Sequence, residues 1–513
     1  MFSTVLSAAV YGVSCKFIHV EADVSSGMPV VSMVGFLASE VKEAKERVRT
    51  AIKNSGIKIP AKRITINLAP ADLRKEGASF DLPIAVAMLA SLGYITPDSL
   101  TDTIIVGELS LNGVINPVTG VMSIVTEAKK HGIKVCVLPI QNAREGAVIT
   151  GIDIIGVESL VQAITYFNNK SSFNAEYCDV EELFAGGAVY HEDYSEIRGQ
   201  EAVKRATTIA VSGMHNILYI GPPGSGKTMV AKRIPSIMPQ MSLEESLEVS
   251  KIYSITGILP VENPILIKRP FRTPHHTITT SALVGGGSIP RPGEISRAHK
   301  GVLFLDEMLE YKKDTLEVLR QPLEDKNINI SRKSGTYTFP ADFMLVAAMN
   351  PCKCGFYPDL NKCTCTTWEI ERYLGKLSQP LLDRIDICAE APTIHYEEIV
   401  AEKTGESSKE IRKIVEQAHE IQKERYKNLG FLFNSQLPVS LLDKYCYLGA
   451  EEHFVLEQAF HKLNLSVRAY HKIIKVARTI ADLEGKQFIE VSHISEAICY
   501  RGVDRKYWGL NRS

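Results

Sequence analysis

Residues 221–228 carry the glycines, the lysine and the hydroxyl group that phosphate binding requires. They fit the pattern GxxxxGK(S/T) at every fixed position and comprise Gly221, Pro222, Pro223, Gly224, Ser225, Gly226, Lys227 and Thr228. Glycines let consecutive backbone N–H groups turn toward phosphate oxygens, while Lys227 reaches the β and γ phosphates and Thr228 offers a hydroxyl to Mg²⁺. The segment therefore predicts a P-loop that binds ATP with Mg²⁺.

Two adjacent carboxylates, Asp306 and Glu307, follow the apolar residues 302–305. At the end of a buried strand beside the P-loop strand, Asp306 would hold Mg²⁺ and Glu307 would polarise the attacking water. An acidic pair by itself also fits a solvated strand end, but its place downstream of a P-loop favours ATP hydrolysis. Asn350 follows the apolar residues 344–349 in the same way, and its amide is suited to placing the lytic water.

Four cysteines gather directly after Asn350. They form the pairs Cys352-x-Cys354 and Cys363-x-Cys365, which lie within fourteen residues. Four thiolates close a tetrahedral Zn²⁺ site, although C-x-C is tighter than the usual spacing. The sequence favours structural zinc, with free thiols or a redox pair as the alternatives, and disfavours catalytic zinc because all four positions would be filled.

A basic turn lies between the two carboxylates and Asn350. Residues 327–339 alternate in polarity on both sides of Arg332 and Lys333, which predicts a β-hairpin with these cations near its tip. Such a tip could contact DNA phosphates without reading sequence, and the alternative is an ordinary solvated hairpin. The adjacent His275 and His276 favour a structural or loop-contact role, because neighbouring histidines tend to point apart.

The surrounding pattern predicts an α/β protein that positions these groups. Residues 216–220 read as a buried strand before the P-loop, and the chain from Lys227 onward as a helix that ends at Pro235. In the N-terminal part the predicted elements are strands at 30–34 and 64–68 and helices at 40–55 and 82–92. Helices at 408–429, 441–463 and 466–484 form a helical lid. The expected domains are 1–165, a linker 166–192, an ATPase core 193–395 and the lid 396–513.

Composition narrows the class of protein. The 513 residues include 58 Lys and Arg against 59 Asp and Glu, so no global positive field attracts nucleic acid and any DNA contact must be local. Two stretches with few charges, 1–15 and 82–101, suit neither a membrane span nor a signal peptide. We therefore expect a cytoplasmic protein without a membrane partner, in which the ten cysteines stay reduced.

The N-terminal part resembles the proteolytic domain of Lon-type proteases. The resemblance rests on residues 75–81, 107–113 and 132–139 and implies a Lon-like fold of the ribosomal protein S5 domain 2 type. On this register Ser79 takes the position of the nucleophile, but Met122 takes that of the activating lysine. Because a thioether cannot accept a proton from a hydroxyl, we expect no peptidase activity, and Ser79 reads as a turn or cap residue.

Several segments together resemble the YifB/ComM family of magnesium-chelatase-like AAA+ ATPases across almost the whole chain. The most specific ones are residues 272–276, 283–287, 291–295 and 381–387. The resemblance implies that Asn350 is sensor 1, that Arg384 is an arginine finger acting on the neighbouring subunit, and that Arg468 is sensor 2 in the lid. A surface ion pair with Asp383 or Asp386 is the alternative for Arg384.

The function implied by this resemblance is a hexameric, ATP-driven motor on single-stranded or branched DNA. Branch migration during recombination or natural transformation is the activity it suggests. The alternative is a remodelling chaperone of the magnesium-chelatase kind, which would use ATP to reshape a protein partner. Both hypotheses require the same nucleotide site, so DNA-stimulated ATPase activity separates them.

Overall fold

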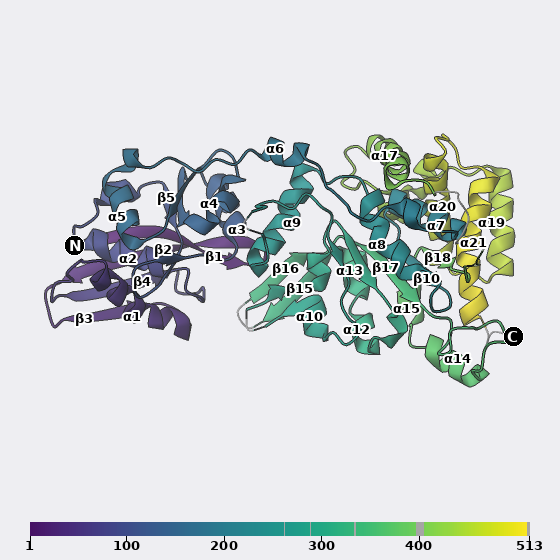
Figure 1. The fold of residues 1–513 in the computed structure, drawn as a ribbon, viewed down its shortest axis with the longest axis horizontal. Helices are drawn as coiled ribbons and strands as arrows, with labels where there is room; N and C mark the ends of the chain where they lie inside the picture. The colour runs from purple at the N-terminus through teal and green to yellow at the C-terminus, as the bar shows by residue number, and fades with distance from the viewer. Residues whose placement is uncertain (261, 288, 333–334, 395, 397–404, 510–513) are drawn as a thin grey trace.

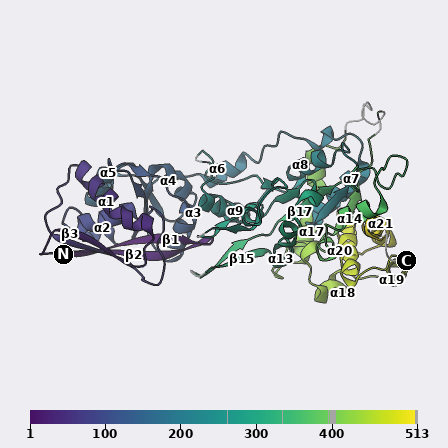
Figure 2. The ribbon, with the colours of Figure 1, turned by 90° about the horizontal axis from the view of Figure 1, so that it is seen from below.

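The computed structural model of the protein describes residues 1–260, 262–287, 289–332, 335–394, 396 and 405–509. The molecule is elongated (Figure 1). An N-terminal sheet with its helices lies at one end, the P-loop sheet lies in the middle, and the C-terminal helices lie at the other end, an order that the orthogonal view in Figure 2 repeats. No helix among the described residues is both long and apolar enough to cross a membrane.

A mixed seven-stranded sheet forms the N-terminal end, in the order β3-β4-β2-β1-β5-β8-β9. Its strands are β1 Phe2–Tyr11, β2 Ser14–Ser25, β3 Val30–Val34, β4 Arg63–Ala69, β5 Thr103–Ile105, β8 Val135–Pro139 and β9 Asp153–Val157, with a small pair β6 Glu108–Leu109 and β7 Ile115–Asn116. Its helices are α1 Ser39–Asn54, α2 Asp81–Ser91, α3 Val121–Lys130, α4 Ile140–Ala147 and α5 Leu160–Asn168, with the 3-10 turns η1 Pro97–Leu100 and η2 Lys170–Ser172. Every residue of α2 is buried, because this apolar helix packs against β1 and β2.

The strands predicted at 30–34 and 64–68 and the helices predicted at 40–55 and 82–92 are confirmed as β3, β4, α1 and α2. Helix α5 crosses the boundary expected between residues 165 and 166, and its Tyr166 and Phe167 are buried in the hydrophobic core of the N-terminal sheet. The following segment contains α6 Val180–Ala185 and reaches the P-loop region through η3 Tyr194–Glu196.

The central sheet has five parallel strands in the order β11-β14-β17-β10-β18. They are β11 Phe271–Arg272, β14 Val302–Leu305, β17 Met344–Met349, β10 Ile217–Ile220 and β18 Ile387–Glu390. The expectation that the strand before Asp306 lies directly beside the P-loop strand is wrong, because β17 pairs with both and separates them. Since all these strands are parallel, their carboxyl ends still meet at one edge.

The longer helices in the region of this sheet are α7 Glu201–Gly213, α8 Lys227–Ile237 and α9 Leu243–Thr256. Helix α8 does not end at Pro235 but continues to Ile237, because a proline in the last turn removes only one terminal hydrogen bond. The shorter helices are α10 Thr280–Val284, α11 Glu294–Arg297, α12 Lys313–Glu317, α13 Arg320–Asp325, α14 Thr367–Leu374 and α15 Gln379–Leu382, with η4 Met308–Glu310. Two antiparallel pairs complete the region, β12 Gly285–Gly286 with β13 Arg291–Pro292 and β15 Asn327–Arg332 with β16 Gly335–Pro340.

The C-terminal region is helical, as predicted. It contains α17 Ser408–Arg425, η5 Asn434–Gln436, η6 Val439–Leu441, α18 Leu442–Tyr445, α19 Ala450–Lys462, α20 Val467–Leu483 and α21 Val491–Trp508. The single helix predicted at 441–463 is instead two, because the chain breaks before Gly449, which begins α19 in extended conformation. The boundary expected at 395/396 involves residue 395, which lies outside the described residues. One hydrophobic core joins these helices to α7, α8 and β10.

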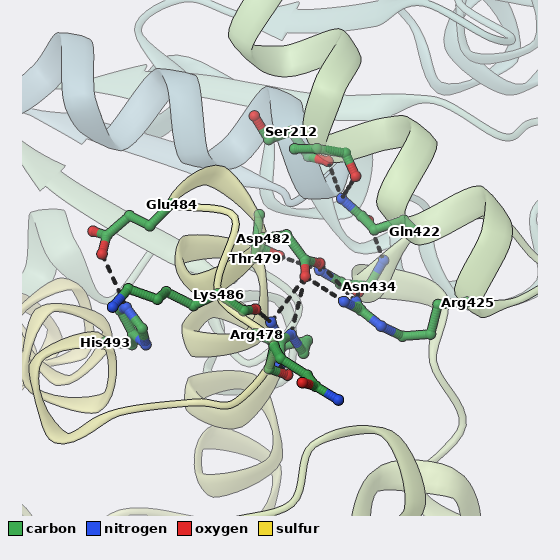
Figure 3. A network of polar contacts seen from close by, with 12 residues as sticks. Ser212, Gln422, Arg425, Asn434, Arg478, Thr479, Asp482, Glu484, Lys486 and His493 are labelled. Atoms are coloured by element: carbon green, nitrogen blue, oxygen red, sulfur yellow. Dashed lines mark hydrogen bonds and ion pairs between the residues drawn. The ribbon is translucent and has the colours of Figure 1, made fainter.

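A buried carboxylate ties the lid helices together (Figure 3). Asp482 on α20 is fully buried and accepts hydrogen bonds from Arg425 on α17, from Nε of Arg478 at 3.1 Å and from Nδ2 of Asn434 at 2.8 Å. Gln422 extends the network to the carbonyl of Ser212 on α7. The lid is thereby hydrogen-bonded to the helix that precedes the P-loop strand.

Candidate active site

The P-loop joins β10 to α8 and surrounds a buried lysine. Gly224 and Gly226 have φ values of +75° and +81°, which only glycine adopts without strain. These two residues let the loop curve around the side chain of Lys227. The Lys227 ammonium donates to the carbonyl oxygens of Gly221 and Pro222 at 2.7 Å each. Burial lowers the pKa of Lys227 to about 8, against the opposing effect of Asp306 and Glu307. The loop therefore holds a desolvated cation where phosphate oxygens would bind.

Thr228 and Asp306 meet across the edge of the sheet. The Thr228 hydroxyl donates to Oδ2 of Asp306 at 2.8 Å, although the two residues follow strands that are not adjacent. Hydroxyl and carboxylate oxygens are the ligand types that Mg²⁺ takes in nucleotide sites. This pair is therefore suited to hold the metal ion.

Glu307 occupies an unusual backbone conformation beside this pair. Its φ and ψ are +48° and +47°, in the left-handed region that non-glycine residues rarely adopt. Its backbone N–H donates to Oδ1 of Asp306 at 3.0 Å, and its side chain is exposed. Strain of this kind is found at functional sites, where the fold imposes it.

Asn350 lies at the end of β17, between the P-loop strand and the Asp306 strand. Its Oδ1 accepts from the Lys227 ammonium at 3.3 Å. The structure therefore brings Lys227, Thr228, Asp306, Glu307 and Asn350 to one edge of the parallel sheet, as the sequence predicts for a nucleotide site.

Gln200 is a candidate residue that the sequence analysis missed. It has φ +60°, is 6% exposed, and donates from Nε2 to the carbonyls of Ser225 and Pro392 at 3.1 and 2.6 Å. Within the described part of the chain, its buried Oε1 has no hydrogen-bond donor. The signal in the sequence was only the Gly199-Gln200 pair before α7, which is too short to recognise. A buried acceptor beside the P-loop fits the amino group of a nucleotide base.

Arg384 and Arg468 do not lie at this edge. Asn216, which precedes β10, donates from Nδ2 to the Arg384 carbonyl at 3.0 Å, so Arg384 lies at the amino end of the strand whose carboxyl end carries the P-loop. Four residues of β10 separate the two edges by roughly 13 Å. Neither Asp383 nor Asp386 pairs with Arg384; its guanidinium contacts Oε1 of Glu324 at 2.5 Å and is 11% exposed.

The two arginines share a cavity of about 610 Å³. Other cations that line it are Lys326, Lys472 and Lys475, and its acids are Glu324, Asp342, Asp383 and Asp386. No P-loop residue is among its lining residues. Arg384 and Arg468 are therefore brought together with each other, but apart from the nucleotide site of their own chain.

The four cysteines form a compact cluster. All four sulfur atoms lie within 4.8 Å of one another, and the distances among Cys352, Cys354 and Cys363 are 3.3, 3.7 and 3.5 Å. A tetrahedral Zn²⁺ with Zn–S bonds of about 2.3 Å separates its sulfur ligands by about 3.8 Å. The backbone N–H of Tyr357 points at the Cys352 sulfur at 3.4 Å, which would stabilise a thiolate. The donor set therefore fits zinc.

The predicted hairpin is confirmed as β15 and β16, in which Arg332 pairs with Gly335. Ile328, Ile330, Tyr337 and Phe339 anchor one face in the core, and Arg332 is exposed near the turn. Lys333 lies outside the described residues. The β1–β2 turn of the N-terminal sheet packs on this hairpin, where the Tyr11 and Tyr337 rings stack at 4.3 Å.

His275 and His276 lie in the segment between β11 and α10. Their rings are 4.1 Å apart, and Nδ1 of His275 is 2.9 Å from the Thr277 hydroxyl. The two rings therefore do not point apart as expected, and the loop-contact role of the pair stays a prediction.

Ser79 lines a separate cavity of about 340 Å³ between the N-terminal sheet and the hairpin. It lies in the turn before α2, as one half of the expectation has it, but it does not cap this helix, whose N-cap is Phe80. Met122 is fully buried in α3 and is not part of the cavity lining. The position where a Lon-type base would stand therefore holds a thioether inside the core.

Comparison with known proteins finds matches to magnesium chelatase families in the N-terminal, central and C-terminal parts of the chain. The family described as "Magnesium chelatase, subunit ChlI" matches residues 193–399, "Subunit ChlI of Mg-chelatase" matches 20–142, and "Magnesium chelatase, subunit ChlI C-terminal" matches 405–501. Lon protease 2 of Bacillus subtilis (strain 168) is 29% identical over 127 residues, which are 25% of this chain and 22% of that protein.

Two relatives match almost from end to end. The YifB protein of Escherichia coli (strain K12) is 42% identical over 98% of this chain and 97% of its own length. The competence protein ComM of Haemophilus influenzae (strain ATCC 51907 / DSM 11121 / KW20 / Rd) is 41% identical over 98% of this chain and 97% of its own length. With its parallel P-loop sheet and these relatives, the chain belongs to the YifB/ComM family of magnesium-chelatase-like AAA+ proteins.

Proposed function

We propose that this protein is an ATP-hydrolysing AAA+ motor that assembles as a hexamer in the cytoplasm and moves on single-stranded or branched DNA. The observation that carries the proposal is the division of catalytic groups between two edges of one sheet. The phosphate-binding groups lie at the carboxyl edge, and Arg384 with Arg468 lies at the amino edge. A nucleotide site is complete only where two copies meet, and a ring satisfies this at every contact.

Each group at the carboxyl edge has a role that its geometry supports. Lys227 binds the β and γ phosphates. Its hydrogen bonds to these phosphates replace those that it donates to the carbonyl oxygens of Gly221 and Pro222 in the free loop. Thr228 and Asp306 would hold Mg²⁺, which when bound neutralises charge on the phosphates. Glu307 accepts a proton from the attacking water, and Asn350 orients that water beside Lys227.

The neighbouring copy supplies the two arginines that the nucleotide site of one chain lacks. Arg384 and Arg468 approach the γ-phosphate held by the next subunit, where a planar guanidinium matches charge spread over several oxygens. Arg384→Ala then abolishes hydrolysis in uniform rings. In mixed rings, subunits that have a disabled P-loop but an intact Arg384 restore part of it. Absence of restoration in every mixture, with normal assembly, removes Arg384 from this role.

We further propose that Cys352, Cys354, Cys363 and Cys365 hold one structural Zn²⁺. The distances between the sulfur atoms support this, as does the absence of a disulfide among the described cysteines. Metal analysis of protein purified without added zinc is expected to give close to one zinc per chain. Less than a tenth of that amount contradicts the assignment.

DNA is the proposed substrate because the relative ComM is named a competence protein and because the hairpin presents Arg332 at its exposed end. The matches to magnesium chelatase favour a second candidate, a protein-remodelling chaperone. ATPase rates with and without single-stranded and forked DNA separate the two. Stimulation by DNA supports the motor, whereas unchanged rates together with no retention of DNA support the chaperone.

A further inference from the structure

The cysteine cluster lies against the nucleotide site. Cys352 comes two residues after Asn350, and the loop that follows approaches the P-loop at Pro223. A Cβ atom at Gly355 would overlap Cδ of Pro223, one of the variable residues of the P-loop. Gly355 has φ +87°, and its N–H donates to the Cys352 carbonyl at 3.1 Å, so a tight turn carries the chain from the first cysteine onto Pro223.

Apolar burial holds only part of this loop in place, because Tyr357 and the cysteines pack on the core of the P-loop sheet but most of the residues between them are exposed. Phe356 and Leu360 are 42% and 81% exposed, and Cys352 is the fully buried member of the cysteine set. Tyr357 makes the main aromatic contact, edge to face with Tyr507 of α21 at 6.1 Å between ring centres. The convergence of the four sulfur atoms therefore joins the beginning of the loop, residues 352–354, to its end, residues 363–365.

The residue before Pro223 contacts the lysine of the proposed phosphate site. Lys227 donates to the carbonyl of Pro222, the residue before Pro223, and to Oδ1 of Asn350, the residue from which the cysteine loop departs. The loop thus contacts the P-loop at Pro223 and joins it again through Asn350. A change in the loop alters two of the groups around the lysine at once.

We propose that the cysteine loop is a metal-closed support for the P-loop, so that Zn²⁺ at the four sulfur atoms sets the affinity for ATP through the contact of Gly355 with Pro223. The inference rests on the proposed zinc centre and ATP site, and adds that the two are coupled. Bound zinc fixes the loop, and the fixed loop holds Pro223 and Asn350 where Lys227 can meet phosphates. Loss of the metal leaves the P-loop without this support.

Gly355→Ala tests the contact, with Gly93→Ala as the matched control. Both glycines have nearly the same left-handed φ, +87° and +84°, but a Cβ at Gly93 meets nothing within 4 Å. Both variants therefore carry the same backbone strain, and only the first presses on Pro223. Titration of full-length protein with a fluorescent ATP analogue and Mg²⁺ is expected to show a Kd raised about tenfold in Gly355→Ala and unchanged in Gly93→Ala. Zinc content stays at the wild-type level in both.

Zinc removal tests the same coupling by changing the metal centre instead of the contact with Pro223. Treatment with 1,10-phenanthroline, followed by repurification, is expected to raise the Kd for the ATP analogue in the wild type, and added Zn²⁺ restores it. In Gly355→Ala the same treatment has a smaller effect, because the contact is already altered. Equal affinity with and without zinc, or equal Kd values for Gly355→Ala and Gly93→Ala, overturns the proposal.

The outcomes are distinct from failure of the proposed function. Absence of zinc from the purified wild type defeats the metal centre by metal analysis alone, and absence of any ATP binding defeats the nucleotide site. Bound zinc and bound ATP that do not affect each other defeat only the coupling.

Discussion

Lys472 of α20 donates to Oδ1 of Asp386 at 2.7 Å, and this ion pair joins the segment that carries Arg384 to the helix that carries Arg468. Lys472 lies one helical turn after Arg468, and Asp386 lies two residues after Arg384. Although burial alone raises the pKa of Asp386, Lys472 and His215 hold the pKa of this carboxyl well below its usual range. The Asp386 carboxyl therefore stays charged, and its contact with Lys472 links the segments that carry the two arginines.

Lys472→Met is expected to lower kcat for ATP on the order of a hundredfold, since displacing a catalytic group by about 1 Å has effects of this size. The Kd for ATP stays unchanged, because the variant leaves the P-loop intact. Lys475→Met is the control: it removes the same charge from the same helix and cavity, but within the described residues Lys475 donates to the Ser435 carbonyl and has no ion pair. Lys472→Arg restores part of kcat. A fall in ATP affinity together with kcat would instead indicate general damage to the fold.

Lys227→Ala and Glu307→Gln are expected to have different effects. The first removes the cation that meets the phosphates and raises the Kd for ATP by about a hundredfold or more. The second keeps ATP binding and lowers kcat by about a hundredfold to ten-thousandfold, because only the water loses its base. Equilibrium binding and single-turnover hydrolysis measure the two quantities. Normal hydrolysis by Glu307→Gln would show that another residue is the base.

The lowered pKa of Lys227 makes ATP binding depend on pH. Free Lys227 loses its proton as pH rises through about 8, whereas bound phosphates favour the ammonium and raise this pKa again. Binding above pH 8 therefore takes up a proton, and affinity falls by up to about tenfold per pH unit. Calorimetry at pH 9 in two buffers of different ionisation enthalpy is expected to show this uptake, and the same pair at pH 7 to show none from Lys227. No uptake at pH 9 would mean that the lysine is charged in the free site.

The hairpin prediction concerns DNA alone. Arg332→Ala with Lys333→Ala is expected to weaken DNA binding, to reduce its salt dependence and to stop strand movement, while basal ATPase activity survives. Lys312→Ala with Lys313→Ala is the control, because it removes two adjacent, exposed cations from the same region. Binding at several salt concentrations and a branch-movement assay are the measurements. Equal loss in both double variants would point to overall charge and not to the hairpin.

Asp482→Ala is expected to destabilise the lid by about 3–5 kcal/mol, because it leaves Arg425 and Arg478 buried without their counter-charge. Glu490→Ala breaks an ion pair with Lys486 whose partners are about half exposed, and is expected to cost no more than about 1 kcal/mol. Calorimetric unfolding compares the two. A similar loss in both would show that the network in Figure 3 contributes little.

Short sequence patterns made part of the fold and part of the candidate site predictable. The P-loop, the strand before Asp306, the strand before Asn350 and the hairpin at Arg332 each occupy a short stretch whose period or fixed residues are visible in the chain. The clustering of the cysteines followed from their spacing in the same way. These features depend on neighbours in sequence, so the sequence alone determined them.

Other relationships depended on residues far apart in the chain. The order of the strands placed β17 between β10 and β14, and the parallel pairing of β18 with β10 set Arg384 at the edge opposite the P-loop. Gln200 was not recognised because its role comes from the carbonyls of Ser225 and Pro392, which only folding brings to it. The sequence by itself determined the residue types and the spacing of the proposed ATP site. The tertiary structure decided which of them share a site, because strand pairing, buried ion pairs and the contact of Gly355 with Pro223 arise between segments that no local pattern connects.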